Sequence, residues 1–291
     1  MPTKIEWANE VWNPVTGCTK VDEGCRNCYA ERMSKRLKGR CGYPADDPFR
    51  VTLHPDRLDK PLHWRKPRRV FVNSMSDLFH KDVPHEIIGS VWVMMEACPQ
   101  HQFIILTKRA DLMRRVITGY LLSPLPNVWL GVSVHDQASA DERLPVLLQT
   151  PAAKRFLSIE PCLGAVDFAP RPDTYSWLQN TVVDFTPNGQ KITNIPALDL
   201  VILGGESGPG ARPMHPDWAR SVRDQCQAAG VPFMFKQWGE YCPPRQLSPE
   251  EFRNWVEAGT LMWDDRPQDV PYKVGKKAAG RLLDGVIHDG E

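Results

Sequence analysis

In the stretch Gln102-Phe103-Ile104-Ile105-Leu106 the last four residues form a short apolar run, followed by Thr107-Lys108-Arg109 and by a helical pattern over Lys108 to Ile117. Such continuous runs are typical of strands that are buried on both faces of a parallel sheet. The same unit recurs along the chain. Further strands are predicted around 11–15 and at 69–73, 128–133, 155–159, 200–203 and 232–236, and further helices at 84–97, 137–148 and 215–229. About six or seven such units favour an α/β fold, a partial (β/α) barrel of parallel strands, with a doubly wound sheet as the alternative.

Residues 171–196 interrupt this rhythm. They contain two β-like runs around Asn188-Gly189, a dipeptide that favours tight hairpin turns. We therefore expect a β-hairpin insert in a barrel that spans residues 1–240. The remainder, residues 241–291, is expected to form a C-terminal extension that packs on the barrel.

Three cysteines, Cys18, Cys25 and Cys28, lie in one N-terminal loop with the spacing C-x6-C-x2-C. Two thiolates at C-x2-C can reach one metal or one cluster without straining the backbone, which favours an iron–sulfur cluster. Three ligands would leave one metal position open for chemistry. A zinc site with Cys41 as the fourth ligand and a set of ordinary buried thiols remain as alternatives.

Composition restricts the location and the partners. The chain has 291 residues, a formal net charge of +1 and eight cysteines. It opens without the apolar segment of a signal peptide and contains no apolar run long enough for a membrane span, so a cytoplasmic protein with reduced thiols is expected. Cys98, Cys162 and Cys226 are expected in the core. Basic residues cluster at 32–40, 60–69 and 273–281, which makes a polyanionic substrate plausible.

Polar residues follow six of the predicted strands. In barrels the carboxyl ends of the strands form the active site, so these residues are expected to share a pocket. The glycine-rich loop at 204–210 permits a close backbone approach to a ligand, and Glu206 is expected to project from it. The loop is neither a phosphate loop nor a dinucleotide fingerprint. Zinc-peptidase and serine-hydrolase motifs are absent from the sequence.

Several motifs together resemble a phage and prophage family of unknown function that is labelled by its three-cysteine motif. They include residues 12–18, 24–30, 71–80, 158–161, 204–208 and 235–239. A barrel whose first strand leads into such a loop also resembles the radical S-adenosylmethionine (SAM) enzymes. The spacing x6 and the position of Gly204-Gly205-Glu206 after the sixth strand differ from the usual pattern of that superfamily.

The resemblance implies a [4Fe–4S] cluster held by Cys18, Cys25 and Cys28, with SAM bound at the open iron. It places the methionine part of SAM near Ser74, Ser76 and Asp77. It places the ribose and adenine near Ser133, Ser158 and Glu160, while Glu206 could hold substrate.

The predicted function is therefore that of a radical SAM enzyme that modifies a nucleotide or a nucleic acid. A flavodoxin- or ferredoxin-like reductant is the expected partner. The alternatives are a zinc-stabilised nucleic-acid-binding protein without catalytic activity and an iron–sulfur protein that only transfers electrons.

Overall fold

The computed structural model describes residues 5–120, 122–169, 177–186, 189–247, 249–257 and 269–290. Its main sheet has seven strands in the order β1-β4-β5-β6-β7-β10-β11. This order follows the chain from one edge to the other and never reverses, as it would in a doubly wound sheet. Because β1 and β11 stand at opposite ends of the order, the sheet is open. The prediction of an α/β fold with a partial (β/α) barrel of parallel strands is confirmed.

The strands of the main sheet and four of the helices between them lie close to the predicted ranges, whereas the helix at Tyr29–Arg36 was not predicted. The strands are β1 (Glu10–Trp12), β4 (Arg69–Val72), β5 (Gln102–Thr107), β6 (Val128–Val134), β7 (Lys154–Ile159), β10 (Leu200–Gly204) and β11 (Phe233–Gln237). The helices are α1 (Tyr29–Arg36), α2 (His85–Glu96), α3 (Ala110–Gly119), α4 (Gln137–Gln149) and α5 (Pro216–Ala229). The remaining helices are α6 (Pro249–Glu257) and α7 (Lys276–Ala279), and the short strands are β2 (Val15–Thr16), β3 (Thr52–Leu53), β12 (Tyr241–Cys242) and β13 (Tyr272–Lys273).

Helix α5 shows why the boundaries were predictable. It begins at a proline, whose fixed φ suits the first turn, and its N-cap residue His215 accepts a hydrogen bond from the backbone N–H of Asp217. It ends at Gly230, which has the left-handed conformation (φ +68°) that closes many helices.

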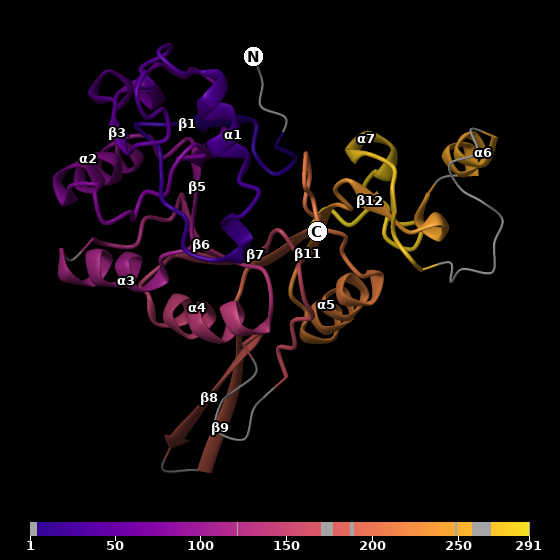
Figure 1. Cartoon of the computed structure of the whole chain (residues 1–291). Helices are drawn as coiled ribbons and strands as arrows, with labels where there is room; N and C mark the ends of the chain where they lie inside the picture. The colour runs from indigo at the N-terminus through magenta and orange to yellow at the C-terminus, as the bar shows by residue number, and fades with distance from the viewer. Residues whose placement is uncertain are drawn as a thin grey trace. The chain divides into compact units, whose positions relative to one another are not determined.

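The chain divides into two compact units. The first comprises residues 1–133 and 142–156, and the second comprises residues 134–141 and 157–291. In the first unit β4, β5 and β6 pair in parallel register, with Ile104 opposite Phe71 on one side and Trp129 on the other. Figure 1 shows α2 and α3 beside β5 and β6. The expected boundary at residue 240 stays a prediction.

Apolar side chains of the first unit form a core around Trp12, which is fully buried and lies 5.8 Å from Phe103 between ring centroids. The indole N–H of Trp12 donates to the backbone oxygen of Arg57 at 2.7 Å, so burial leaves no unsatisfied donor there.

Cys98, Cys162 and Cys226 are buried as predicted, and Cys242 is buried as well.

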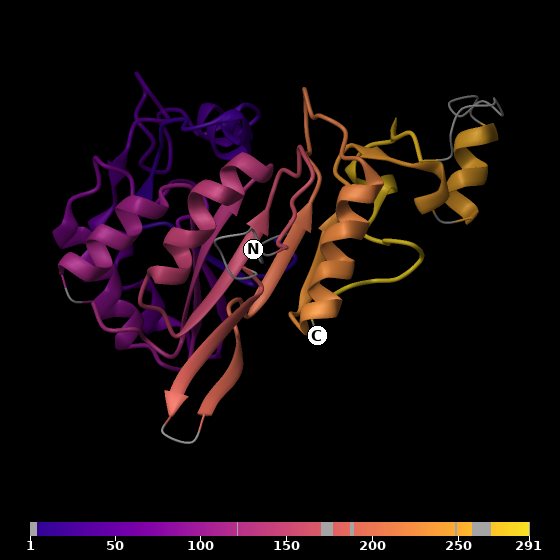
Figure 2. The same ribbon diagram turned by 90° about the horizontal axis from the view of Figure 1, so that it is seen from below.

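In the second unit the insert forms a hairpin. Strands β8 (Gln179–Thr186) and β9 (Gly189–Pro196) pair antiparallel over their whole length, and Figure 2 shows them side by side. This confirms the predicted hairpin insert, although Asn188 of the predicted turn lies outside the described residues.

The end of the chain is held to α5 by what we call the Asp284 cluster, formed by Asp284, Arg220, Arg223 and Gln246. The Asp284 carboxylate accepts hydrogen bonds from Arg220 at 3.0 Å, Arg223 at 2.6 Å and Gln246 at 2.8 Å. Burial acts to raise the pKa of this carboxyl, but the three donors outweigh it and hold the pKa well below its usual range.

Among the helices in the described part of the chain, none is long and apolar enough to cross a membrane.

Candidate cofactor site at the cysteine loop

The cysteine loop leaves the sheet at Gly17, directly after β2. The backbone N–H of Gly17 donates to the oxygen of Met75 at 2.9 Å, and that of Cys18 donates to the oxygen of Phe49 at 3.0 Å. Gly17 has φ +84°, and a Cβ atom there would lie 2.1 Å from the backbone oxygen of Arg50. Only glycine fits this approach, so the start of the loop is fixed by backbone contacts.

Asp77, at the carboxyl end of β4, is the centre of the polar network beside the loop. Its carboxylate accepts hydrogen bonds from the Thr107 hydroxyl at 2.7 Å and the Phe79 N–H at 3.0 Å on one oxygen. The other oxygen accepts from the Lys108 N–H at 3.2 Å and from Nη1 of Arg109 at 2.9 Å. Four donors occupy about all the acceptor sites of a carboxylate. Asp77 therefore joins the segments after β4 and β5 and orients Arg109.

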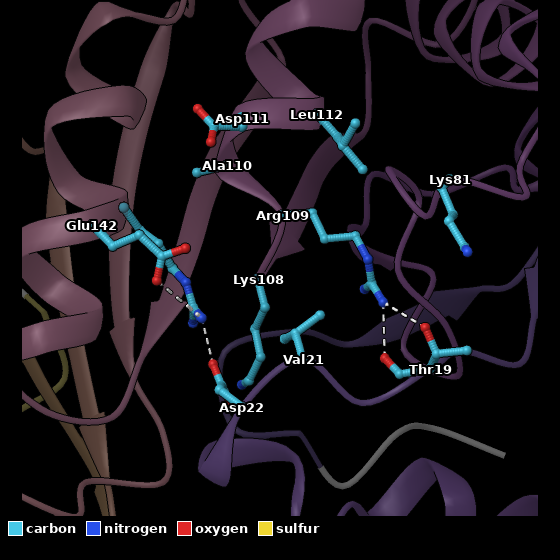
Figure 3. A pocket seen from close by; sticks show the side chains of 11 residues that line it. Thr19, Val21, Asp22, Lys81, Lys108, Arg109, Ala110, Asp111, Leu112 and Glu142 are labelled. Atoms are coloured by element: carbon cyan, nitrogen blue, oxygen red, sulfur yellow. Dashed lines mark hydrogen bonds and ion pairs between the residues drawn. The ribbon is translucent and has the colours of Figure 1, made fainter.

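Arg109 connects this network to the cysteines. Its Nη1 also lies 3.4 Å from Sγ of Cys18, and its Nη2 donates to the backbone oxygen of Thr19 at 2.8 Å. The Thr19 hydroxyl accepts from Nη2 at 3.1 Å, and it contacts Nε2 of the buried His80 at 2.8 Å. Figure 3 shows the guanidinium directed at Thr19.

His80 is neutral in this arrangement. Its Nδ1 accepts a hydrogen bond from the N–H of Asp82 at 3.1 Å, which leaves the proton on Nε2, where it is donated to Thr19. Burial lowers the pKa of His80, and the positive charge of Arg109 lowers it further.

A second arginine holds the middle of the loop. The side chain of Arg143, from α4, is only 4 % exposed, and its Nη2 donates to the carboxylate of Asp22. Its Nη1 donates to the backbone oxygen of Ser133 at 2.7 Å. The hydroxyl of Ser133 in turn accepts from Nζ of Lys108 at 2.7 Å. Arg109 and Arg143 thus fix the loop at two points, the first at Cys18 and Thr19 and the second at Asp22.

A cavity of about 410 Å³ lies beside the loop within the first unit. This volume falls in the range of small-molecule sites. Val21 and Leu112 provide apolar walls, while Lys81 and Lys108 add two ammonium groups (Figure 3). Arg109 is also part of the lining, so one wall of the cavity is formed by the group that contacts Cys18.

The three loop thiols are free and partly exposed. Burial raises the pKa of the Cys18 thiol to about 11, Asp77 adds to the increase, and Arg109 opposes it. Cys25 adds the smallest of these contributions to the increase.

In the described residues, no three His, Cys, Asp or Glu side chains converge where one metal ion could bind. The zinc alternative with Cys41 as the fourth ligand therefore stays a prediction. A cubane cluster binds each thiolate through a different iron and so holds its cysteines farther apart. A donor set of three accessible thiols in one anchored loop fits such a cluster.

The serines predicted to contact SAM lie at the end of β4, as expected, but they already have protein partners. The Ser74 hydroxyl donates to Oδ1 of Asn13 at 3.2 Å, and the Ser76 hydroxyl donates to the backbone oxygen of Val15 at 3.0 Å. These contacts hold the segment after β4 against the start of the cysteine loop. A role for Ser74, Ser76, Asp77 and Ser133 in binding SAM stays a prediction.

In the second unit the structure brings together Ser158, Glu160 and Lys236. Nζ of Lys236 lies 2.8 Å from Oε1 of Glu160, and the Ser158 hydroxyl donates to Oε2 at 3.2 Å. Gly204 of β10 makes room for this pair, because a Cβ there would lie 2.7 Å from Oε1 of Glu160.

Glu206 turns toward its own loop. Its carboxylate accepts hydrogen bonds from Nη2 of Arg212 at 2.7 Å and from the backbone N–H of Arg212 at 2.9 Å, with a side chain that is 6 % exposed. Glu206 therefore lies against its own loop, where it binds Arg212. We expected its side chain to project from the loop. A role in holding substrate stays a prediction.

Four basic residues complete these networks, and none of them was assigned an individual role from the sequence: Lys108, Arg109, Arg143 and Lys236. Lys108 and Arg109 directly follow a predicted strand and Lys236 ends one, so these three belong to the polar residues that were expected to share a pocket. Arg143 lies inside a helix, and nothing in its local sequence indicates that it faces the loop.

The fold and the loop define an α/β protein with an open parallel sheet and three free cysteines anchored beside its carboxyl edge. The chain belongs to the family described as "Protein of unknown function (DUF5131)", whose model matches residues 2–291. No curated protein matches the sequence. Among solved structures, the chain is similar to spore photoproduct lyase complexed with dinucleoside spore photoproduct, at 11% identity and a TM-score of 0.38. The match covers 75% of this chain and 61% of that one, and a likeness of this size assigns neither a fold nor an activity.

Proposed function

We propose that Cys18, Cys25 and Cys28 hold a [4Fe–4S] cluster and that the protein is a radical SAM enzyme. The observation that carries the proposal is the anchored loop, in which three accessible thiols of one unit have no disulfide and one of them faces a guanidinium. When bound, the reduced cluster would supply one electron to SAM, whose C5′–S bond then breaks to give methionine and a 5′-deoxyadenosyl radical that takes a hydrogen atom from the substrate.

The protein's own residues have three tasks in this proposal. Gly17 and the backbone contacts of Cys18 fix the start of the loop, and Arg143 fixes its middle through Asp22. Arg109 keeps a donor against the Cys18 sulfur. The cavity beside the loop gives a small molecule access to this edge of the first unit.

A nucleotide or a nucleic acid is the proposed substrate class. Helix α1 starts directly after Cys28, and α1 and the turn after it expose Lys35, Arg36, Lys38 and Arg40 to solvent. Such a basic surface attracts phosphate groups. The same cations suit an acidic electron donor of the flavodoxin or ferredoxin kind, which is the proposed partner.

The test is anaerobic purification with iron and sulfide reconstitution, followed by an assay for 5′-deoxyadenosine with dithionite and SAM. Four irons per chain and release of 5′-deoxyadenosine are the expected results. A cluster that binds no SAM would identify an electron-transfer protein instead. A colourless protein with stoichiometric zinc and no iron would overturn the proposal.

A further inference from the structure

Arg109 contacts both the cysteine loop and a buried carboxylate, and no motif of the sequence assigns it a role. Its side chain is 9 % exposed, and so is that of its partner Asp77. A buried ion pair of this kind is held by additional hydrogen bonds, which Thr107 and the two backbone N–H groups supply to Asp77. The guanidinium therefore has a fixed orientation, and Nη1 reaches both Asp77 and the Cys18 sulfur.

We infer that Arg109 is a positioning residue that raises the reduction potential of the cluster by donating to the Cys18 sulfur, an inference that rests on the proposed function. Hydrogen bonds to the ligating sulfurs and the local charge are the means by which proteins set the potentials of iron–sulfur clusters. Reduction adds an electron to the cluster, and a nearby positive charge stabilises the reduced form more than the oxidised form.

Loss of the guanidinium acts twice in the same direction. It removes the donor to Cys18, and it leaves uncompensated the Asp77 carboxylate, which shares Nη1 of Arg109 with that sulfur. Both effects disfavour the reduced cluster. Arg109→Gln should therefore shift the midpoint potential to a more negative value, with at least a tenfold change in the ratio of reduced to oxidised cluster at fixed potential. For a one-electron couple a tenfold change corresponds to about 59 mV.

Two control variants separate this role from others. Lys81→Gln removes a positive charge from the wall of the same cavity, where Lys81 is exposed. Arg143→Gln removes the other arginine that holds the loop, which contacts Asp22 and no cysteine in the described contacts. The proposal expects both to change the potential by less than half of the shift in Arg109→Gln.

The experiment is an anaerobic redox titration of the reconstituted wild-type protein and the variants, followed by visible absorption and electron paramagnetic resonance, with iron content measured in parallel. The negative shift in Arg109→Gln alone supports the inference. An unchanged potential in Arg109→Gln with full iron content overturns it. If Arg109→Gln holds no iron, Arg143→Gln decides: normal iron content there supports a specific role of Arg109 at Cys18, and equal loss overturns it. A wild-type protein that takes up no iron would refute the proposed function itself, which the first measurement shows separately.

Discussion

Replacement of Gly17 by alanine tests the idea that the cysteine loop is fixed where it leaves the sheet. The added methyl group would lie 2.1 Å from the backbone oxygen of Arg50, 2.4 Å from its carbonyl carbon and 2.6 Å from the oxygen of Phe49. All three atoms are backbone, so a side-chain rotation cannot relieve the clash. The loop and the segment at 49–50 must move apart.

The cost has two parts. A non-glycine residue in the left-handed region costs about 1–2 kcal/mol. Separation of the segments also breaks the hydrogen bond from the Cys18 N–H to Phe49, and such a bond contributes about 0.5–1.5 kcal/mol. The contact from the Gly17 N–H to Met75 is at risk as well. We expect a loss of about 3 kcal/mol in the free energy of unfolding, together with a lower iron content after reconstitution because Cys18 moves with Gly17.

The assay is urea unfolding followed by tryptophan fluorescence. With a slope of about 1–3 kcal/mol per M, the midpoint should fall by about 1 M or more. Gly89→Ala in α2 is the matched control, because a Cβ at that position meets nothing within 4 Å. In a helix this change should stabilise by about 0.5–1 kcal/mol. A Gly17→Ala protein with the wild-type midpoint and full iron content would refute the reasoning.

Three further predictions concern the ligands, the end of the chain and the core. Cys25→Ala should abolish cluster assembly and Cys41→Ala should leave the iron content unchanged; equal loss would contradict a three-cysteine site. In the Asp284 cluster the lowered pKa of Asp284 means that its stabilisation is complete above the unfolded pKa of about 3.9 and is lost as the pH falls toward the folded value. Asp284→Asn should therefore destabilise the protein near pH 7, with a difference from wild type that shrinks in acid unfolding curves below about pH 4. Gly131→Ala places a methyl group 2.4 Å from the ring of Phe156 and should cost about 1–3 kcal/mol in urea unfolding, but nothing further in a Phe156→Ala background.

The architecture could be predicted because local pattern and tertiary role agree. Residues 103–106 are apolar without interruption, and Phe103 and Ile105 are fully buried in a strand that has a neighbour on each side. The hairpin at 179–196 was visible for the same reason, as two β-like runs that flank a turn dipeptide. The division of the main sheet between two compact units has no such local signal, because it depends on packing between distant segments.

The cysteine loop could be predicted from spacing alone, but its anchors could not. The contact from Arg109 to Cys18 joins residues 91 positions apart, and the contact from Arg143 to Asp22 joins residues 121 positions apart. Each depends on which strands are neighbours and where a long side chain ends. Asp77 illustrates the consequence, since its sequence position after a strand does not show that four protein donors bind its carboxylate.

Polar residues at the carboxyl ends of strands therefore have two roles that sequence cannot separate. Those with several intramolecular partners, such as Asp77 and Glu206, maintain the shape of a loop. Lys81, at the wall of the cavity, is exposed and suits contact with a ligand. Arg109 belongs to both groups, because Asp77 fixes its orientation while its remaining donor capacity faces a cysteine. A guanidinium can do this because its five N–H donors form a rigid fork, whereas a lysine ammonium could not reach both partners in a fixed geometry. Arg109 therefore links Asp77, in the segment after β4, to the cysteine loop.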